Sequence, residues 1–325
     1  MIRSTMIRSF CCAAAALLGI ATGSAQAALQ QQLSISTPSG TRDYILAKSP
    51  NIAAGPRPLV IILHGHIGTA ANALGGGKTP SPLSAWLNIA DREQLLVVAL
   101  QGLKGSDNHT GWHDCRLDAT EDPTADDVGF VERVVNGLVQ AGRADPHRIY
   151  VMGMSNGGMM AYRLALEMHP TPAAIAGVSS SMASQTACGQ TPPKVSVLLI
   201  NGTDDPIVPY GGGKVGLRGY KTGTVIGAEA TRDFWLHTDG LADVPGIAYS
   251  FPHLSSSDTT RASKVTYGPN SGPQVEMVTI QNGGHIEPSL IYHYGWLYHQ
   301  LVGTQNSDFE SAEEAWSFFK DKRSK

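Results

Sequence analysis

The segment Arg148-Ile-Tyr-Val-Met-Gly-Met-Ser155-Asn-Gly-Gly-Met-Met-Ala-Tyr-Arg163 decides the fold. Its first half is a short apolar run with β-branched and aromatic residues, which predicts a buried strand. Its second half places apolar side chains at mostly helical spacing, which predicts a helix packed on that strand. The two halves are joined by the sequence Gly153-Met154-Ser155-Asn156-Gly157. We therefore expect a sharp strand-to-helix turn with Ser155 at its tip.

The two outer glycines of this turn have a steric reason. A Cβ at Gly153 or Gly157 would clash with the neighbouring strand or helix, and the serine between them takes a strained backbone conformation. The Ser155 hydroxyl is then exposed near the positive end of a helix. In a chain with 36 glycines the five-residue pattern alone also fits an ordinary turn with an incidental serine. The flanking strand and helix favour the other interpretation, a nucleophile elbow.

Composition places the chain among globular proteins. Of its 325 residues, 42 % are hydrophobic and 16 % are charged, which is typical of a soluble domain with a large core. A single α/β domain of this size is common. The formal net charge is −3, and no basic stripe is visible along the sequence. Nucleic acid is therefore not expected as a partner.

The first 27 residues have the pattern of a secretory signal peptide. Arg3 and Arg8 form a positive start, residues 10–22 are apolar, and Ala25-Gln26-Ala27 is a small-residue cleavage pattern. We expect cleavage after Ala27, which leaves residues 28–325 as one domain in the periplasm or outside the cell. Loss of the two arginines would change the net charge from −3 to −5. The alternative is an uncleaved membrane anchor, for which the run is short.

The predicted signal peptide determines which cysteines remain in the mature chain. Cys11 and Cys12 would leave with the signal, so that Cys115 and Cys188 remain. In an oxidising compartment a single pair is expected to form one disulfide, and its spacing fits no zinc site. Closing that loop would stabilise the fold by roughly 4 kcal/mol on the chain-entropy model. Two separate buried thiols are the alternative.

Strands and helices alternate along the rest of the chain. Several predicted strands are continuous apolar runs, which are typical of parallel strands buried on both faces. The pattern predicts an open, doubly wound, mainly parallel sheet without an internal repeat. We expect residues 101–123, 205–223 and 239–273 to form a small cap over the site. The predicted strands are 41–48, 59–63, 95–100, the segment before Ser155, 173–178, 195–200 and 274–280, with 30–40 as a loosely held strand or arm, and the predicted helices are 82–94, 126–141, the segment after Ser155, 224–238 and 309–320.

A serine nucleophile needs a base, usually a histidine held by a carboxylate. In a fold with a nucleophile elbow the chain order is serine, acid, histidine, and each residue follows a strand. The strand predicted at 195–200 runs into Asp204 and Asp205. One of the two is the candidate acid, and position alone does not choose between them. The other is expected to stabilise the turn.

The chain order narrows eleven histidines to the five beyond Asp205. Only His285 closely follows a predicted strand, within the glycine-rich turn Asn282-Gly283-Gly284-His285. We therefore predict His285 as the base. The other four are His237 in a helical segment, His253 in a polar loop, and His293 and His299 in an aromatic segment expected to pack on the core or line the pocket.

A tetrahedral intermediate needs two backbone donors for its oxyanion. The N–H of Asn156 directly follows the nucleophile, and the loop after residue 63 supplies the second donor, for which we choose the N–H of His66. The side chains of His64 and His66 are expected to be structural. Trp112 is a candidate for a substrate-contacting aromatic residue, with a structural role as the alternative. This chemistry needs neither a metal nor an organic cofactor.

Six segments together resemble the secreted polyhydroxybutyrate depolymerase family, which is close to the bacterial feruloyl esterases of the α/β-hydrolase superfamily. The likeness extends from about Thr41 to the terminal helix. It implies an α/β-hydrolase fold with one catalytic domain. The segments are Leu63-His64-Gly65, Trp112–Cys115, Asp126–Phe130, Gly153–Gly158, Gly202–Tyr210 and Gly283-Gly284-His285.

The resemblance also implies roles for single residues. In the family the acid is the aspartate of a Gly-Thr-x-Asp-x-x-Val-Pro-Tyr segment, which is Asp205 here, and the base is the histidine of the Gly-Gly-His turn, which is His285. The implied catalytic set is thus Ser155, Asp205 and His285. Family members often carry a Trp-Pro pair after that turn, whereas this chain has Ile286-Glu287-Pro288. The departure lies at the expected rim of the pocket.

Three functions remain open from the sequence. The first is a secreted hydrolase of short hydroxyalkanoate esters or polyesters. The second is the same chemistry on feruloyl or acetyl esters of plant polysaccharide. The third is a non-catalytic hydrolase-fold protein that binds a ligand or partner, which the complete catalytic set disfavours. Because no threonine-rich linker or substrate-binding module follows the terminal helix, we expect small esters or soluble oligomers as substrates.

Overall fold

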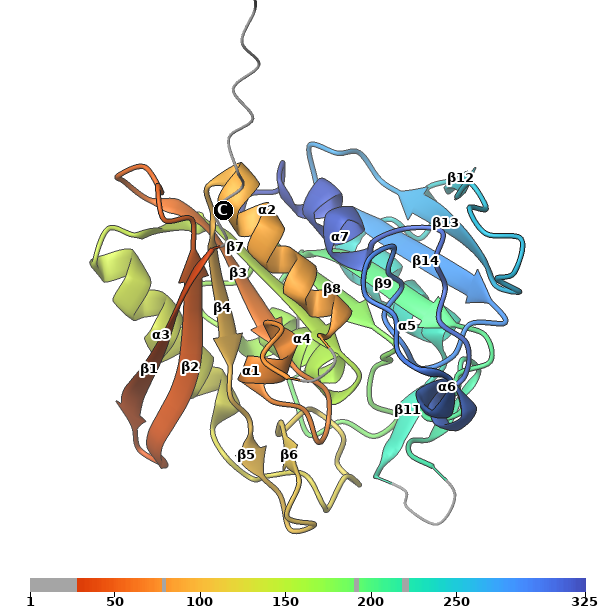
Figure 1. Ribbon diagram of the computed structural model, residues 1–325, viewed down its shortest axis with the longest axis horizontal. Helices are drawn as coiled ribbons and strands as arrows, with labels where there is room; N and C mark the ends of the chain where they lie inside the picture. Colours follow the sequence, from red (N-terminus) through yellow and green to blue (C-terminus); the bar gives the residue numbers. More distant parts are fainter. Residues whose placement is uncertain (1–27, 78–79, 190–192, 218–221) are drawn as a thin grey trace, which may run out of the picture.

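A computed structural model describes residues 28–77, 80–189, 193–217 and 222–325, so the predicted signal peptide lies outside the described residues. In the described residues, one sheet has ten strands in the order β1-β2-β4-β3-β7-β8-β9-β14-β13-β12. Figure 1 shows this sheet running across the molecule. The strands of this sheet are β1 (Leu29–Thr37), β2 (Gly40–Lys48), β3 (Arg57–Leu63), β4 (Leu96–Leu100), β7 (Ala144–Met154), β8 (Ala174–Val178), β9 (Ser196–Gly202), β12 (Ile247–Ser250), β13 (Arg261–Tyr267) and β14 (Val275–Gln281).

The centre of the sheet is parallel and its edges are antiparallel. Strands β4, β3, β7, β8, β9 and β14 pair in parallel. The hairpin β1–β2 adds an antiparallel edge beside β4, and β13 and β12 add the other edge beside β14. Every residue of β4, β8 and β9 is buried, because helices cover both faces. The prediction of a mainly parallel, doubly wound sheet is confirmed.

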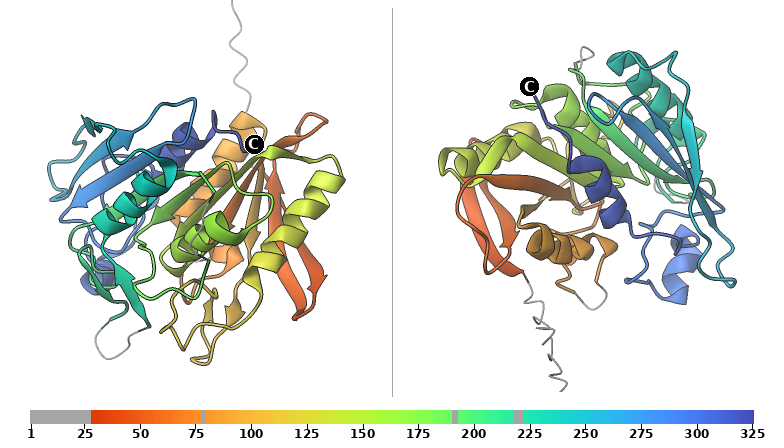
Figure 2. Two further views of the ribbon diagram at one scale, coloured as in Figure 1. Left: turned by 180° about the vertical axis from the view of Figure 1, so that it is seen from behind. Right: turned by 90° about the horizontal axis from the view of Figure 1, so that it is seen from above.

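Helices cover the sheet on two sides. On one face, Trp86 and Phe319 pack with Tyr150 of β7, and the rings of Tyr150 and Phe319 stack with centroids 5.1 Å apart. On the other face, Phe130 and Trp235 are fully buried. Figures 1 and 2 show α2 and α7 on the first side and α3, α4 and α5 on the second. The helices are α1 (Ala70–Ala73), η1 (Pro82–Ala85, a 3-10 turn), α2 (Trp86–Glu93), α3 (Asp127–Gln140), α4 (Asn156–Glu167), α5 (Ala228–Asp239), α6 (Trp296–Val302) and α7 (Ser311–Phe319).

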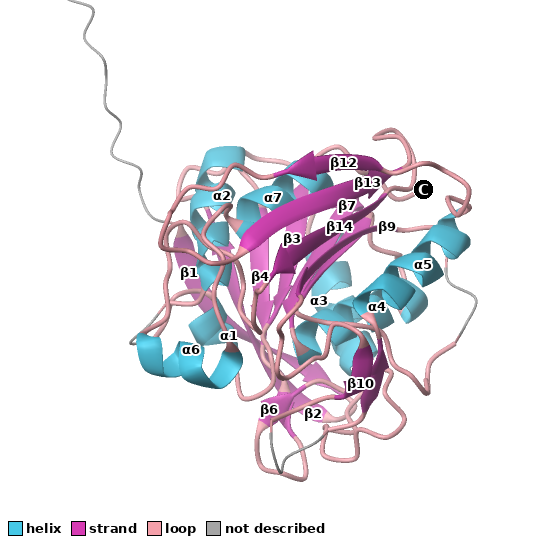
Figure 3. Ribbon diagram, turned by 90° about the vertical axis from the view of Figure 1, so that its right-hand side faces the viewer, coloured by secondary structure: helices cyan, strands magenta, loops and turns pink. Residues whose placement is uncertain are grey.

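Three expectations about local structure are wrong. The helix predicted at 224–238 begins with a short strand, β11 (Thr224–Ile226), which pairs with β10 (Gly212–Lys214) before α5 starts. Residues 239–273 extend the sheet as β12 and β13 instead of forming a cap, as Figure 3 shows. His293 was expected to pack on the core or line the pocket, but it is exposed, as are its neighbours Trp296 and Leu297, whereas His299 is partly buried. Strand β12 could not be predicted from apolar periodicity, because all four of its residues are exposed.

The loop predicted at 101–123 contains a small hairpin, β5 (Leu103–Lys104) and β6 (Thr110–Gly111). Together with residues 205–217 it borders the site described below. Among the helices of the described residues, none combines the length and the apolar composition that a membrane crossing requires.

Candidate active site

The turn between β7 and α4 has the shape expected of a nucleophile elbow. Ser155 has φ 56° and ψ −124°, a conformation that L-residues rarely adopt. A Cβ at Gly153 would overlap the carbonyl of Gly157, and a Cβ at Gly157 would overlap the carbonyl of Leu63. The Ser155 N–H donates to the carbonyl of Val178 on β8 at 2.8 Å. Neighbouring strands therefore hold the turn and force glycine on both sides of the serine.

Asp205 and His285 meet beyond the ends of two adjacent parallel strands, β9 and β14. His285 Nδ1 lies 2.7 Å from Asp205 Oδ2, and their side chains are only 8 % and 1 % exposed. The other carboxylate oxygen of Asp205 accepts from the N–H groups of Ile207 and Val208, both at 2.8 Å. These contacts fix the carboxylate and, through it, the imidazole. Asp204 is exposed and accepts from the Thr203 hydroxyl at 3.0 Å.

Ser155 and His285 line the same cavity, which has a volume of about 220 Å³. His66 and Asn156 line it as well. Two of the loops expected to cap the site contribute to its lining, with Arg116 and Asp122 from one and Ile207, Val215, Gly216, Leu217 and Thr222 from the other. Its apolar lining residues are Ile67, Met159, Ile207, Val215 and Leu217.

Residues 64–68 lie directly against the elbow and are here called the oxyanion loop, after the role that the sequence predicts for the His66 N–H. A Cβ added to Gly65 would stand 3.4 Å from both the Met154 carbonyl and the Ser155 Cβ. Because Asn156 is the first residue of α4, its N–H has no carbonyl of a preceding helical turn to bond. The structure thus brings the two predicted donor residues, Asn156 and His66, to the cavity that Ser155 lines.

The expectation that Trp112 contacts substrate is contradicted. Its side chain is fully buried, and its indole N–H donates to the carbonyl of His64 at 2.8 Å. Its ring lies 5.0 Å from the His64 ring. Trp112 therefore supports the oxyanion loop from behind, which is the structural role that the sequence left open. An indole stacked under a loop cannot be told from one facing a pocket by sequence position alone.

The side chain of Asn156 is anchored in a buried polar network. Its Oδ1 accepts from the Trp112 N–H at 2.7 Å, and its Nδ2 donates to the Trp112 carbonyl at 3.1 Å and to Asp114 Oδ2 at 2.9 Å. These bonds hold the start of α4 to the loop at 112–114. Asn156, the residue after Ser155, is consequently fixed by its side chain as well as by its helix.

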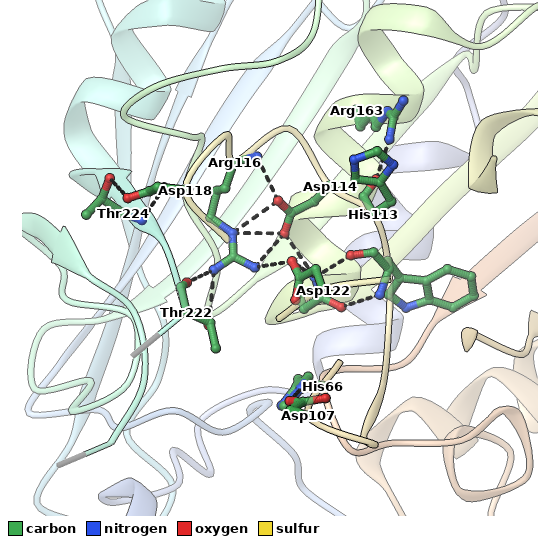
Figure 4. A network of polar contacts seen from close by, with 12 residues as sticks. His66, Asp107, His113, Asp114, Arg116, Asp118, Asp122, Arg163, Thr222 and Thr224 are labelled. Atoms are coloured by element: carbon green, nitrogen blue, oxygen red, sulfur yellow. Dashed lines mark hydrogen bonds and ion pairs between the residues drawn. The ribbon is translucent and has the colours of Figure 1, made fainter. Parts of the chain in front are cut away.

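Arg116 joins two buried carboxyl groups, Asp114 and Asp122, as Figure 4 shows. Its guanidinium contacts Asp114 Oδ2 and Asp122 Oδ2, each at 2.8 Å, and donates to the carbonyl of Thr222. Burial and the nearby Asp114 charge raise the pKa of Asp122 to about 8. At neutral pH the Asp114–Asp122 pair therefore retains one proton and one negative charge, and the guanidinium balances that charge.

Sequence reasoning missed this network. Asp114 and Arg116 flank Cys115, and that short charged stretch was the signal available. A charged loop is usually solvated, and only the structure shows that all three charged side chains are buried. Cys115 is joined to Cys188 in a disulfide with a Cα–Cα distance of 5.3 Å. The disulfide therefore fixes the same loop that holds Asn156.

His64 is neutral because of its surroundings. It is 3 % exposed, its Nε2 accepts from the Gly102 N–H at 3.0 Å, and its Nδ1 lies 2.8 Å from the Gly65 carbonyl. With Nε2 as acceptor, the proton belongs on Nδ1 and bonds that carbonyl. Burial lowers the pKa of His64 to about 4. Burial also lowers the pKa of His66, against the opposing charge of Asp107. Both side chains support the loop, as the sequence predicted for them.

The sheet order, the elbow and the Asp205–His285 pair beside it define an α/β hydrolase. A family model described as Phospholipase/Carboxylesterase matches residues 90–222. NocK of Nocardia uniformis subsp. tsuyamanensis, a provisionally named esterase, is 31 % identical over 290 residues, which cover 86 % of this chain and 79 % of NocK. The chain belongs to the esterase family of NocK within the α/β-hydrolase superfamily.

More distant relatives carry more specific names. Feruloyl esterase B of Piromyces equi is 25 % identical over 250 residues, covering 75 % of this chain and 42 % of that protein. A poly(3-hydroxybutyrate) depolymerase of Ralstonia pickettii is 31 % identical over 124 residues, covering 36 % of this chain and 24 % of that protein. The crystal structure of a thermostable esterase has the same fold, with a TM-score of 0.53 and 15 % identity over 91 % of this chain and 63 % of that one.

These findings settle the class of activity. The chain is an esterase of the carboxylesterase type. The non-catalytic alternative left open by the sequence is therefore set aside.

Proposed function

We propose that this esterase is a secreted serine hydrolase with Ser155, Asp205 and His285 as its catalytic triad, and that it acts on short hydroxyalkanoate esters or their soluble oligomers. The observation that carries the proposal is the buried contact of 2.7 Å between His285 Nδ1 and Asp205 Oδ2. It leaves the other imidazole nitrogen, Nε2, for a serine hydroxyl. His285 and Ser155 line one cavity, which supports their action as a pair.

The reaction follows from these positions. The Asp205 carboxylate accepts from Nδ1–H of His285 and thereby keeps Nε2 as the base. His285 takes the proton of Ser155 as Oγ attacks the ester carbonyl, and an acyl-enzyme forms when His285 protonates the leaving alcohol. Water then repeats the sequence and releases the acid. The backbone N–H groups of Asn156 and His66 stabilise the oxyanion in both steps.

The shape of the cavity favours a short acyl group. Sites for drug-sized ligands usually measure roughly 300–1,000 Å³, whereas this cavity measures about 220 Å³. Most of its surface is apolar and comes from side chains such as Ile67, Met159 and Val215, although polar residues line it as well. A hydroxybutyryl unit is small and partly aliphatic, so it suits such a space better than a feruloyl group with its aromatic ring. The relative named as a poly(3-hydroxybutyrate) depolymerase points to the same substrates.

Feruloyl or acetyl esters of plant polysaccharide are the second candidate. Several relatives are named feruloyl esterases, and one of them matches 75 % of this chain. The chemistry at Ser155 would be unchanged, and only the acyl pocket would differ.

The proposal also includes the processing of the chain. Residues 1–27 act as a signal peptide, and residues 28–325 form the catalytic domain. After cleavage, the mature protein is periplasmic or extracellular. The disulfide between Cys115 and Cys188 supports an oxidising compartment.

The deciding experiment compares three substrates with the purified chain from residue 28 onward: a 3-hydroxybutyrate oligomer, methyl ferulate and a short-chain nitrophenyl ester. The oligomer is expected to give the highest kcat/KM, and Ser155→Ala is expected to abolish turnover of all three while its circular dichroism stays unchanged. A preference for methyl ferulate would replace the first substrate class by the second. Residual turnover above background in Ser155→Ala would falsify the assignment of the nucleophile.

A further inference from the structure

Three side chains with metal-binding atoms meet beside the oxyanion loop: His66, Asp107 and His109. His66 Nε2 lies 2.8 Å and His109 Nδ1 lies 3.4 Å from the same oxygen, Asp107 Oδ2. All three ligand atoms lie within 4.8 Å of one another. Figure 4 shows His66 next to Asp107. The proposed esterase mechanism uses none of these three side chains.

We propose that His66, Asp107 and His109 bind one divalent transition-metal ion, with Zn²⁺ as the ion whose chemistry they fit best. Imidazole nitrogen suits zinc and its transition-metal neighbours, and a single carboxylate completes a common set of three protein ligands. Hard ions such as Mg²⁺ and Ca²⁺ prefer sites made of oxygen. Two imidazoles beside one carboxylate therefore select against them.

The distances are close to those a metal would impose. Zinc binds histidine nitrogen and carboxylate oxygen at roughly 2.0–2.2 Å, so tetrahedral ligand atoms stand about 3.4 Å apart. The pair His109 Nδ1 and Asp107 Oδ2 has that separation already, at 3.4 Å. The pair His66 Nε2 and Asp107 Oδ2, now at 2.8 Å, would open by about half an ångström to admit the ion.

The site is both anchored and accessible. Asp107 is held because its Oδ1 accepts from the backbone N–H of His109 at 2.9 Å, which directs Oδ2 toward the two rings. The side chain of Asp107 is 8 % exposed, that of His66 19 % and that of His109 48 %. The half-exposed His109 ring is therefore able to turn onto an entering ion. Water would supply the fourth ligand, as in other zinc sites with three protein ligands.

A bound ion would connect two segments that are far apart in sequence. His66 belongs to the oxyanion loop, whereas Asp107 and His109 lie in the hairpin between β5 and β6. The segments already share two bonds, from the Ile67 N–H to the Thr110 carbonyl at 2.8 Å and from the Thr110 hydroxyl to the Gly68 carbonyl at 2.6 Å. The ion would cross-link them next to the backbone N–H of His66. Only the effect on the oxyanion donor, the backbone N–H of His66, rests on the proposed function.

Calorimetric titration with ZnCl₂ tests the site directly. The chain from residue 28 onward, without a polyhistidine tag and freed of metal with EDTA, is expected to bind one Zn²⁺ per chain with a micromolar Kd and to unfold at a higher temperature with the ion than without it. His109→Ala and Asp107→Asn are each expected to weaken binding at least about tenfold. His237→Ala removes an exposed histidine of α5 and is expected to bind like the wild type.

Two results would overturn the site: no saturable binding by the wild type, or binding by His109→Ala equal to that of His237→Ala. Ester turnover in EDTA keeps this outcome separate from that of the proposed function, because wild type and His109→Ala are expected to turn over equally there. Zinc binding without ester turnover would remove the proposed function and leave the metal site standing.

Discussion

Asn156 and Trp112 exchange two hydrogen bonds. The Trp112 N–H donates to Asn156 Oδ1 at 2.7 Å, and Asn156 Nδ2 donates to the Trp112 carbonyl at 3.1 Å. The pairing joins the first residue of α4 to the loop that carries the disulfide. Because Asn156 follows the proposed nucleophile directly, the position of its N–H depends on this side-chain pairing as well as on the helix.

Replacing Asn156 by alanine is expected to cost both stability and turnover. The change leaves the buried N–H of Trp112 without its acceptor, which costs about 1–3 kcal/mol. It also removes one of the two donors to the Trp112 carbonyl and a donor to Asp114. We expect the free energy of unfolding to fall by about 2–4 kcal/mol, and kcat to fall at least about tenfold with a smaller change in KM. Denaturant titration and steady-state kinetics measure the two effects. Asn51→Ala, at an exposed position, is the matched control, and equal losses in both variants would refute the role of this pairing.

Asp205 and its neighbour Asp204 offer an internal comparison. Asp205 is buried against His285, whereas Asp204 is exposed. Asp205→Asn keeps the shape of the side chain but no longer holds the imidazole in the required tautomer, so we expect kcat to drop by about 10³–10⁴-fold. Asp204→Asn is expected to leave kcat within about threefold of the wild type. If the two variants lost activity equally, Asp205 would not be the acid of the triad.

Most of the fold was predictable because its central strands are short, continuous apolar runs in the sequence. The run at 59–63 and the segment before Ser155 became β3 and β7, since strands buried on both faces tolerate no other pattern. The glycines around Ser155 were predictable for the same kind of reason, because steric overlap forbids any other residue there. Burial on both faces and steric overlap thus each restrict the residue types at a position strongly enough to be recognised in the sequence.

The remainder depends on contacts that sequence does not encode locally. Strand β12 was missed because an exposed antiparallel edge needs no apolar run. The sequence left two roles open for Trp112, because a fully buried indole and a pocket-lining one can have the same sequence neighbours. Arg116 reaches Asp122 and Thr222, and the contact with Thr222 brings together residues 106 positions apart. Only the tertiary structure shows that the side chains of Asp114, Arg116 and Asp122 are buried.

His64 makes the stability of the protein depend on pH. Burial lowers its pKa to about 4 in the folded chain, against 6.5 ordinarily. The unfolded chain therefore binds the proton more readily, so the contribution of neutral His64 is fully present above pH 6.5 and is lost as the pH falls below it. Between pH 7.5 and 5 we expect this group alone to lower the free energy of unfolding by about 2 kcal/mol.

The variant His64→Gln isolates that contribution. Glutamine retains an acceptor for the Gly102 N–H but does not titrate in this range. Denaturant titrations at both pH values are expected to show a loss about 2 kcal/mol larger for the wild type than for His64→Gln. A His64→Gln protein with the full pH dependence of the wild type would show that His64 is not the responsible group.

The bond between Cys115 and Cys188 closes a loop of 73 residues. Loss of that constraint raises the entropy of the unfolded chain by an amount worth roughly 4 kcal/mol, and measured effects of removing native disulfides are typically 2–5 kcal/mol. We expect Cys115→Ser/Cys188→Ser to lower the free energy of unfolding by about 2–4 kcal/mol, with a matching fall in Tm. Dithiothreitol should produce the same loss in the wild type and none in the double variant, because the variant has no bond left to reduce. A wild type whose Tm is unaffected by complete reduction, verified by thiol titration, would show that the core holds the loop at Asp114 and Arg116 in place without the disulfide.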